Sequence, residues 1–270
     1  MELKELLQKI AQMRKEPQFQ TNAFLLPGRL EELLSVPFSQ VEVGDHHVAV
    51  LAWERRFYRL YYYLSRPDES KGDLRRSLSQ HSDAPIVADL VNKPQAIPFS
   101  AAILSEIGFR RIETLIRMHL NMDRTMNRPI CSEAERAAEP DAREIEELLY
   151  QTFNVYVSRL PDRNEIRDLI RYEWIWVIRD GNRIAGLALF KPLPGRQVLL
   201  DQLLVRPGFR GRGLGEKLLQ TGIARLCAGK QVFLWAHTAV VPFYEKYGFE
   251  QEERADCILL FEEEKGRGEN

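Results

Sequence analysis

The sequence has few cysteines, almost no net charge and no long apolar run. Three of its 270 residues are cysteines, and Cys131, Cys227 and Cys257 lie too far apart for the close spacing of a metal site. We therefore expect free thiols, a cytoplasmic location and no bound metal. The formal net charge of -1 argues against nucleic acid as the main partner. No apolar run approaches the roughly 18 to 20 residues of a membrane span, and the N-terminal residues lack the apolar core of a signal peptide, so no membrane partner is expected.

The composition is that of a globular protein with room for two domains. Hydrophobic residues make up 44% of the chain and charged residues 29%, which is enough apolar material for a core. A polar segment without apolar periodicity runs from 121 to 141. It predicts a first domain over residues 1–122, a linker over 123–140 that is helical in part at 132–139, and a second domain over 141–270.

Two parts of the chain share a spaced pattern. Arg66-Pro67 precedes Gly108-Phe109 by the same number of residues as Arg206-Pro207 precedes Gly248-Phe249. An apolar run that is typical of a strand lies before each Arg-Pro pair. One such match could arise by chance, but the common spacing favours a duplicated unit.

The second half mixes strand and helix patterns. Helices are expected near 141–153, 162–172, 216–227 and 241–247, and strands near 174–179, 183–190, 198–205, 231–236 and 257–263. One strand-loop-helix crossover stands out, and Asp180-Gly181-Asn182 is a hairpin signal. The pattern predicts an α/β or α+β fold.

The loop "RPGFRGRGLGEKLLQ", residues 206–220, lies between an expected strand and an expected helix. Glycines at such a junction let backbone N–H groups converge on one point, and the helix N-terminus adds partial positive charge there. Arg206, Arg210 and Arg212 add full positive charges. The loop is either an anion site suited to phosphate or a plain glycine-rich turn with solvated arginines.

Two common phosphate motifs do not fit this loop. Its glycines are spaced G-x-G-x-G, whereas a dinucleotide fingerprint needs G-x-G-x-x-G. The P-loop pattern fails as well, because Lys217 follows a glutamate and Leu218 stands where serine or threonine is needed.

The pattern Arg210-x-x-Gly213-x-Gly215 resembles the pyrophosphate loop of the GNAT family of acyl-CoA N-acyltransferases. Downstream, "FYEKYGF" at 243–249 is similar to the second signature of that family. The resemblance covers roughly residues 139–264 and implies two tandem GNAT-like domains, each a mixed, mostly antiparallel twisted sheet flanked by helices. The first half resembles a degenerate copy, since Leu104 occupies the position of Tyr244.

The resemblance implies roles for a set of residues. Tyr244 would protonate the departing thiolate, and His237 stands where the family often has a coenzyme-binding asparagine. Asp201 is a candidate base, because Leu199 occupies the position of the glutamate of histone-type members; a structural role for Asp201, or deprotonation through water, stays open. Backbone groups would bind the pantetheine arm and thioester at Leu203, Leu204 and Val205, and the pyrophosphate at Arg210, Gly211, Arg212, Gly213, Leu214 and Gly215.

The implied function is transfer of an acetyl group from acetyl-CoA to a primary amine of a small molecule or peptide, by direct attack. One alternative is a regulatory protein that binds acyl-CoA without turnover. Another is a tandem aminoacyl transferase that uses charged tRNA, which the near-neutral charge disfavours. The sequence does not indicate the acceptor, the acyl-chain preference or the oligomeric state.

Overall fold

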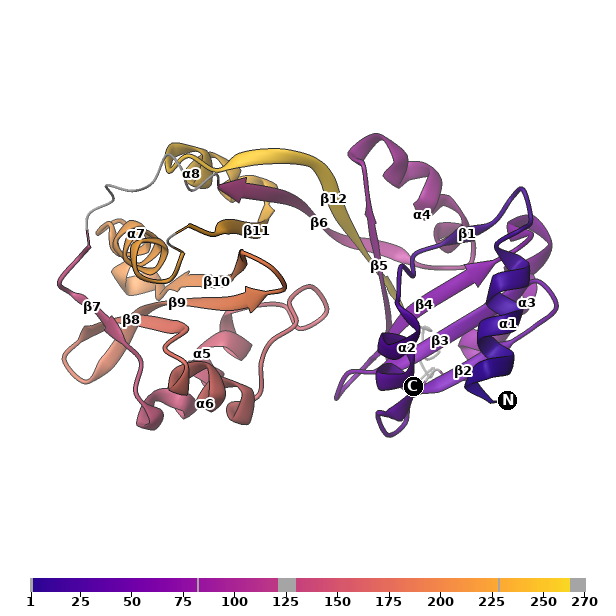
Figure 1. Ribbon diagram of the computed structural model, residues 1–270, viewed down its shortest axis with the longest axis horizontal. Helices are drawn as coiled ribbons and strands as arrows, with labels where there is room; N and C mark the ends of the chain where they lie inside the picture. The colour runs from indigo at the N-terminus through magenta and orange to yellow at the C-terminus, as the bar shows by residue number, and fades with distance from the viewer. Residues whose placement is uncertain (1, 82, 121–129, 228, 263–270) are drawn as a thin grey trace, which may run out of the picture. The chain divides into compact units, whose positions relative to one another are not determined.

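The computed structural model describes residues 2–81, 83–120, 130–227 and 229–262 (Figure 1). The chain forms two compact units. Unit 1 comprises the residues up to Thr114 and those from Glu253 onward, and unit 2 comprises Leu115–Glu252. No helix in the described ranges is both long and apolar enough to cross a membrane.

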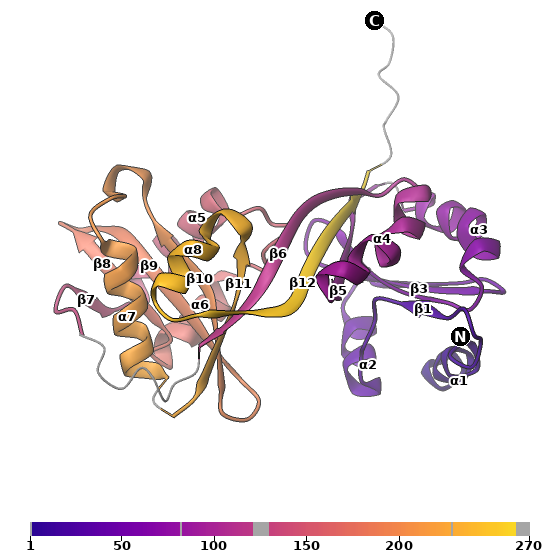
Figure 2. The same cartoon turned by 90° about the horizontal axis from the view of Figure 1, so that it is seen from above.

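Unit 1 is built on the strands β2, β3, β4, β5 and β12, which are neighbours in this order. Its elements are α1 (Leu3–Met13), β1 (Gln20–Thr21), α2 (Pro27–Ser35), β2 (Gln40–Val43), β3 (His47–Trp53), β4 (Tyr58–Leu64), α3 (Pro67–Ser79), β5 (Ile86–Asn92) and α4 (Ile97–Glu106). Figure 2 shows α1 and α2 on one side of this sheet and α3 and α4 on the other. The apolar run before Arg66-Pro67 forms the strand β4, as predicted.

Unit 2 has the strand order β6, β11, β10, β9, β8, β7. Its elements are β6 (Arg110–Leu120, from Leu115), β7 (Ala134–Arg136), α5 (Ala142–Thr152), α6 (Arg163–Arg171), β8 (Ile175–Asp180), β9 (Arg183–Leu193), β10 (Gln197–Val205), α7 (Leu214–Leu226), β11 (Gln231–His237), α8 (Val241–Lys246) and β12 (Glu250–Phe261, up to Glu252). In Figure 1, α7 lies on one side of the strands β8 to β10, and α5 and α6 lie on the other. The mixed α/β fold with a largely antiparallel sheet is as predicted.

The last strand of each half, β6 and β12, contributes residues to both units. In unit 1, β12 pairs antiparallel with β5, from Ala255↔Asn92 to Phe261↔Ile86. In unit 2, β6 pairs antiparallel with β11, from Leu120↔Val232 to Leu115↔His237. The expected second domain included all residues to 270, whereas the structure groups those from Glu253 onward with unit 1. The reason is pairing: β12 begins at Glu250, whereas the sequence predicts a strand only over 257–263, and its second part pairs with β5 of unit 1.

Only the second part of the expected linker, from residue 130 onward, can be compared with the structure. Residues 121–129 lie outside the described residues. The helix expected within 132–139 is wrong, because Ala134–Arg136 form β7 and pair antiparallel with β8. Ala134 is buried in the core beneath α7, and this long-range packing outweighs the helical propensity of the segment.

The two halves share local details. In each, two strands pair in parallel, β4 with β5 and β10 with β11. Gly108 and Gly248 both have positive φ. The N–H of Phe109 donates to Leu104 O at 2.9 Å, and the N–H of Phe249 donates to Tyr244 O at 3.1 Å. The matching turns favour duplication, which stays a prediction.

Candidate functional site

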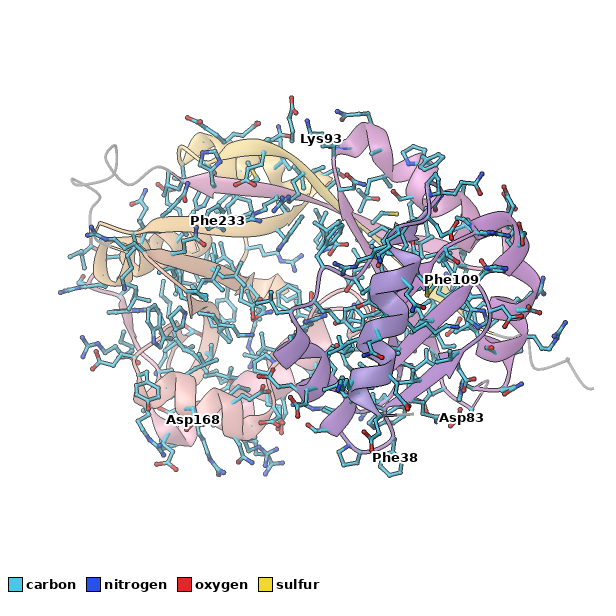
Figure 3. All side chains as sticks on the ribbon, turned by 45° about the vertical axis from the view of Figure 1, so that its right-hand side comes forward. Phe38, Asp83, Lys93, Phe109, Asp168 and Phe233 are labelled. Atoms are coloured by element: carbon cyan, nitrogen blue, oxygen red, sulfur yellow. The ribbon has the colours of Figure 1, made fainter. Side chains whose placement is uncertain are left out.

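The strands β10 and β11 separate soon after they meet. Their parallel pairing runs from Gln197↔Gln231 to Leu199↔Phe233, although β10 continues to Val205 and β11 to His237. Phe233, labelled in Figure 3, therefore marks the last paired position. We call the diverging parts, residues 200–205 and 234–237, the strand fork. Along its inner edges the two strands no longer pair with each other, so backbone groups there can bind another partner.

The glycine loop lies at the end of β10. Gly211 has φ 76° and Gly213, the N-cap of α7, has φ 73°. A Cβ added at either residue would meet no atom within 4 Å. Backbone conformation, rather than crowding, is therefore what requires glycine at these two positions.

The N-terminus of α7 forms a candidate anion site. The first intrahelical bond runs from Lys217 N to Gly213 O at 3.1 Å, so the N–H groups of residues 214–216 have no acceptor within the helix. The helix dipole places partial positive charge at these groups. Arg210 and Arg212 are exposed beside them; Arg210 donates through Nε to Val205 O at 3.2 Å.

Arg206 was expected to add charge at this loop, and that expectation is wrong. Its Nε donates to Ile184 O at 2.6 Å, and its Nη2 donates to the Glu144 carboxylate at 2.6 Å. The side chain thus connects the end of β10 to β9 and α5. Because Glu144 neutralises it, Arg206 is a structural residue and not an anion ligand.

A β-bulge in β10 changes which face its side chains occupy. The register with β9 shifts between Leu200 and Gln202. Leu200 packs in the core on the α7 side, whereas Leu204 packs with α5 and α6. Gln202 lies opposite Leu189, which belongs to the α5-side core. Gln202 therefore faces the α5 side as well.

Asp201, the candidate base, occupies the bulge itself. Its Oδ2 lies 2.5 Å from Lys191 Nζ, with 16% of the Asp201 side chain exposed. Lys191 follows Leu189 by two residues on β9, so the ion pair lies on the α5 side of the sheet. Lys191 and Gln202 were not singled out in the sequence; the signal was a second polar residue beside Asp201 in an otherwise apolar strand.

Tyr244 lies on the opposite side of the sheet. It packs on the α7-side core, as do Leu203 and Val205 of the fork. Its ring centroid is 5.1 Å from that of Phe243 and 5.6 Å from that of Phe249, both edge to face. Burial raises the pKa of the Tyr244 phenol to about 12, so the group stays protonated at neutral pH.

The remaining predicted residues border the fork. His237 is the exposed last residue of β11 and pairs with Leu115 of β6. Leu214 is the buried first residue of α7, and Gly215 follows it on the helix. Loop, fork and Tyr244 are thus gathered in unit 2. The described residues hold no group of three or more histidine, cysteine or acidic side chains suited to a metal ion.

No pattern in the sequence predicts that β6 contributes to unit 2. Arg117 of β6 places its guanidinium carbon 4.4 Å from the ring centroid of Phe233. Its Nε lies 3.3 Å from Glu252. Arg117 lies opposite Trp235 of the fork in the β6–β11 register, so a strand from the first half borders the candidate site.

Unit 1 contains a second fork, and a side chain bridges it. The strands β4 and β5 pair only at Tyr58↔Ile86 and Arg59↔Val87. Asn22 donates through Nδ2 to Leu60 O at 2.8 Å and to Asp89 O at 3.2 Å. Its Oδ1 accepts from Tyr62 N at 2.8 Å. One carboxamide thus joins the two diverging strands.

The described residues of unit 1 form no counterpart of this candidate anion site after β4. The helix α3 begins at Pro67, close behind β4, and Asp68 and Glu69 lie in its first turn. These two carboxylates lie where a phosphate would need positive charge. Within the described residues, only unit 2 combines an open fork with a glycine loop and a helix N-terminus.

Comparisons with known proteins agree on one family. The model of the acetyltransferase (GNAT) domain matches residues 171–251. A mycothiol acetyltransferase of Thermobispora bispora is 43% identical over 61 residues, which are 23% of this chain and 19% of that protein. The chain thus spans about a fifth of the length of the curated relatives it matches.

Solved structures extend the likeness to both units. A tandem GNAT protein from the clavulanic acid biosynthesis pathway has a TM-score of 0.57 at 14% identity, covering 96% of this chain and 94% of its own. A GCN5-related N-acetyltransferase from Sphaerobacter thermophilus has a TM-score of 0.55 at 16% identity, covering 92% and 97%. At such low identity the likeness shows the fold alone.

Proposed function

The chain carries an acetyltransferase (GNAT) domain, and from this premise we propose that it transfers an acetyl group from acetyl-CoA to a primary amine. The observation that carries the proposal is the strand fork between β10 and β11, which opens beside the N-terminus of α7 and its two positive-φ glycines. An open pair of strand edges suits an extended amide-containing arm, and the helix N-terminus suits a pyrophosphate.

The residues present fit the coenzyme. The backbone N–H groups of residues 211–216, supported by Arg210 and Arg212, would hold the pyrophosphate. The inner edge of β10 at Leu203 to Val205 would bind the pantetheine arm and polarise the thioester carbonyl. His237, at the end of β11, is proposed as a further contact. Acetyl-CoA, when bound, supplies an activated acyl group and a thiol leaving group.

Two ionisable side chains flank the fork from opposite faces. Tyr244, on the α7 side, is proposed as the acid that protonates the leaving sulfur; its phenol pKa of about 12 keeps the proton available at neutral pH. Asp201, on the α5 side, is proposed as the base that takes a proton from the amine. With an acid on one face and a base on the other, the amine can lose a proton to Asp201 while the leaving sulfur receives a different proton from Tyr244.

Direct transfer is favoured over a covalent enzyme intermediate. Cys227, at the end of α7, is fully buried, and burial raises the pKa of its thiol to about 12. The thiol is therefore protonated and unreactive at neutral pH. We propose that unit 1 is a degenerate copy whose fork is closed by Asn22, so that each chain binds one acetyl-CoA.

The proposal is tested by measuring thiol release from acetyl-CoA with a set of primary amines: spermidine, glucosamine, tyramine and a lysine-containing peptide. Wild-type protein should release thiol with at least one amine and bind one acetyl-CoA per chain by calorimetry. Binding without amine-dependent release would favour a regulatory acyl-CoA-binding protein instead. Absence of binding would refute the donor site.

The variant Tyr244→Phe separates chemistry from binding. It keeps the ring contacts and removes the hydroxyl, so acetyl-CoA affinity should stay unchanged and turnover should fall by roughly 10- to 1000-fold. Leu104→Phe, at the matching position of the first half, should change stability but not the proton-transfer step. Equal turnover by wild type and Tyr244→Phe would remove Tyr244 from the mechanism.

A further inference from the structure

Gln202 has a buried side-chain oxygen with no partner among the described residues. The residue is 2% exposed. Its Oε1 is buried, and no described residue donates a hydrogen bond to it. Its strand partner Leu189 and its neighbour Leu204 are aliphatic core residues. Buried carboxamides are nearly always hydrogen-bonded, because an unpaired one loses its hydration without compensation.

Gln202 lies on the same face of the sheet as the candidate base Asp201. The bulge in β10 turns Gln202 to the α5 side, where Asp201 pairs with Lys191. The next residue, Leu203, faces the α7 side, where Tyr244 lies. Gln202 thus sits on the base side of the fork, one residue from the backbone proposed to polarise the thioester carbonyl.

We propose that the Gln202 side-chain carbonyl accepts a hydrogen bond from the amine that is acetylated, an inference that rests on the proposed function. An orphaned carbonyl oxygen requires an N–H or O–H donor. A neutral primary amine uses its lone pair to attack and still has two N–H bonds. One N–H is held by Gln202 Oε1, and the other faces the Asp201 carboxylate.

The reaction balances with these groups. The amine nitrogen forms a bond to the acyl carbon, and the bond from that carbon to sulfur breaks. The proton lost by the nitrogen passes to Asp201, and the sulfur receives the Tyr244 proton. Gln202 loses and gains no proton; it orients the amine so that its lone pair faces the acyl carbon. An acceptor nitrogen without a second N–H, as in a secondary amine, should therefore react poorly.

Gln202→Leu tests this role, because leucine fills a similar volume without polar atoms. The apo protein should melt higher by a few degrees, since an unpaired buried amide is removed. Acetyl-CoA affinity should stay within about twofold. With the best primary amine of the set above, kcat/KM should fall about 10- to 100-fold, the scale of one lost hydrogen bond to a reacting group.

Thr221→Val is the matched control. Thr221 is also fully buried in unit 2, but its Oγ1 accepts from Cys131 N at 3.0 Å. Its loss leaves a donor unpaired, so the melting temperature should fall while amine kinetics stay unchanged.

A lower melting temperature in Gln202→Leu would show that Gln202 has a structural partner, such as a buried water, and would overturn the inference whichever amine is the acceptor. Unchanged amine kinetics beside an active wild type would overturn it too, and would leave the proposed function standing. A wild type that acetylates none of the amines would instead count against the proposed function.

Discussion

Replacing Gly213 by glutamate should abolish coenzyme binding while leaving unit 2 folded. A Cβ at this position meets no atom within 4 Å, so the cost in stability arises from φ 73° alone. A non-glycine residue in this conformation costs about 1 to 2 kcal/mol. For a chain of this length, the melting temperature should fall by roughly 2 to 4 °C per kcal/mol.

The loss in affinity should be much larger than the loss in stability. A carboxylate roughly 5 Å from a phosphate charge, at an effective dielectric constant of about 20, is repelled by about 3 kcal/mol. Since about 1.4 kcal/mol is a factor of ten, the affinity for acetyl-CoA should drop by more than about 100-fold. Titration calorimetry with acetyl-CoA measures the drop directly.

Gly181→Glu is the matched control. Gly181 lies in the turn between β8 and β9, has φ 57°, and also has open space around its Cβ position. The substitution should lower the melting temperature by a similar amount without affecting acetyl-CoA binding. Equal affinities of wild type and Gly213→Glu, or equal losses in both variants, would refute the assignment of the loop to the pyrophosphate.

Asn22→Ala removes three hydrogen bonds of about 1 kcal/mol each and should lower the free energy of unfolding, measured by chemical denaturation, by about 3 kcal/mol. It should not create a second acetyl-CoA site, because Asp68 and Glu69 still occupy the first turn of α3; a stoichiometry of two would contradict the proposal that this turn cannot hold a phosphate. Burial raises the pKa of Tyr244 to about 12 in the folded protein, against about 10 in the unfolded chain. The protonated phenol therefore contributes fully to the free energy of unfolding below pH 10, and this contribution is lost between pH 10 and 12. In Tyr244→Phe, the free energy of unfolding should fall less steeply over this range. The Cys227 thiol should resist Ellman's reagent at neutral pH in folded protein and react once the chain is unfolded.

Local features of the fold could be predicted from the sequence because local forces decide them. The helix α6 begins where Asp162 accepts from Asn164 N and Glu165 N, a cap visible as an aspartate before an amphipathic run. The strands β8 and β9 meet at the predicted Asp-Gly-Asn turn. The glycine loop could be predicted because Gly211 and Gly213 have positive φ, a conformation that strongly favours glycine.

The rest depends on contacts that no short pattern encodes. The bulge that turns Gln202 to the α5 face, the face of Asp201, arises from the pairing of β10 with β9, and "LLDQLL" has no mark of a register shift. Arg206 stands among loop arginines in the sequence, yet pairs with Glu144 from a distant helix. Asn22 reaches Leu60 and Asp89 across a gap that only the tertiary fold creates.

The shared strands give the first half a role that does not depend on catalysis. The strand β11 forms one edge of the fork, and its outer edge pairs with residues 115–120 of β6 from Val232 to His237. Without β6, β11 would be left with only the short parallel pairing to β10, from Gln197↔Gln231 to Leu199↔Phe233. An inner edge that must stay open for a ligand needs an outer edge that is fully paired. The first half supplies that pairing, and the second half returns β12 to β5, so neither half can be removed without exposing a strand edge of the other.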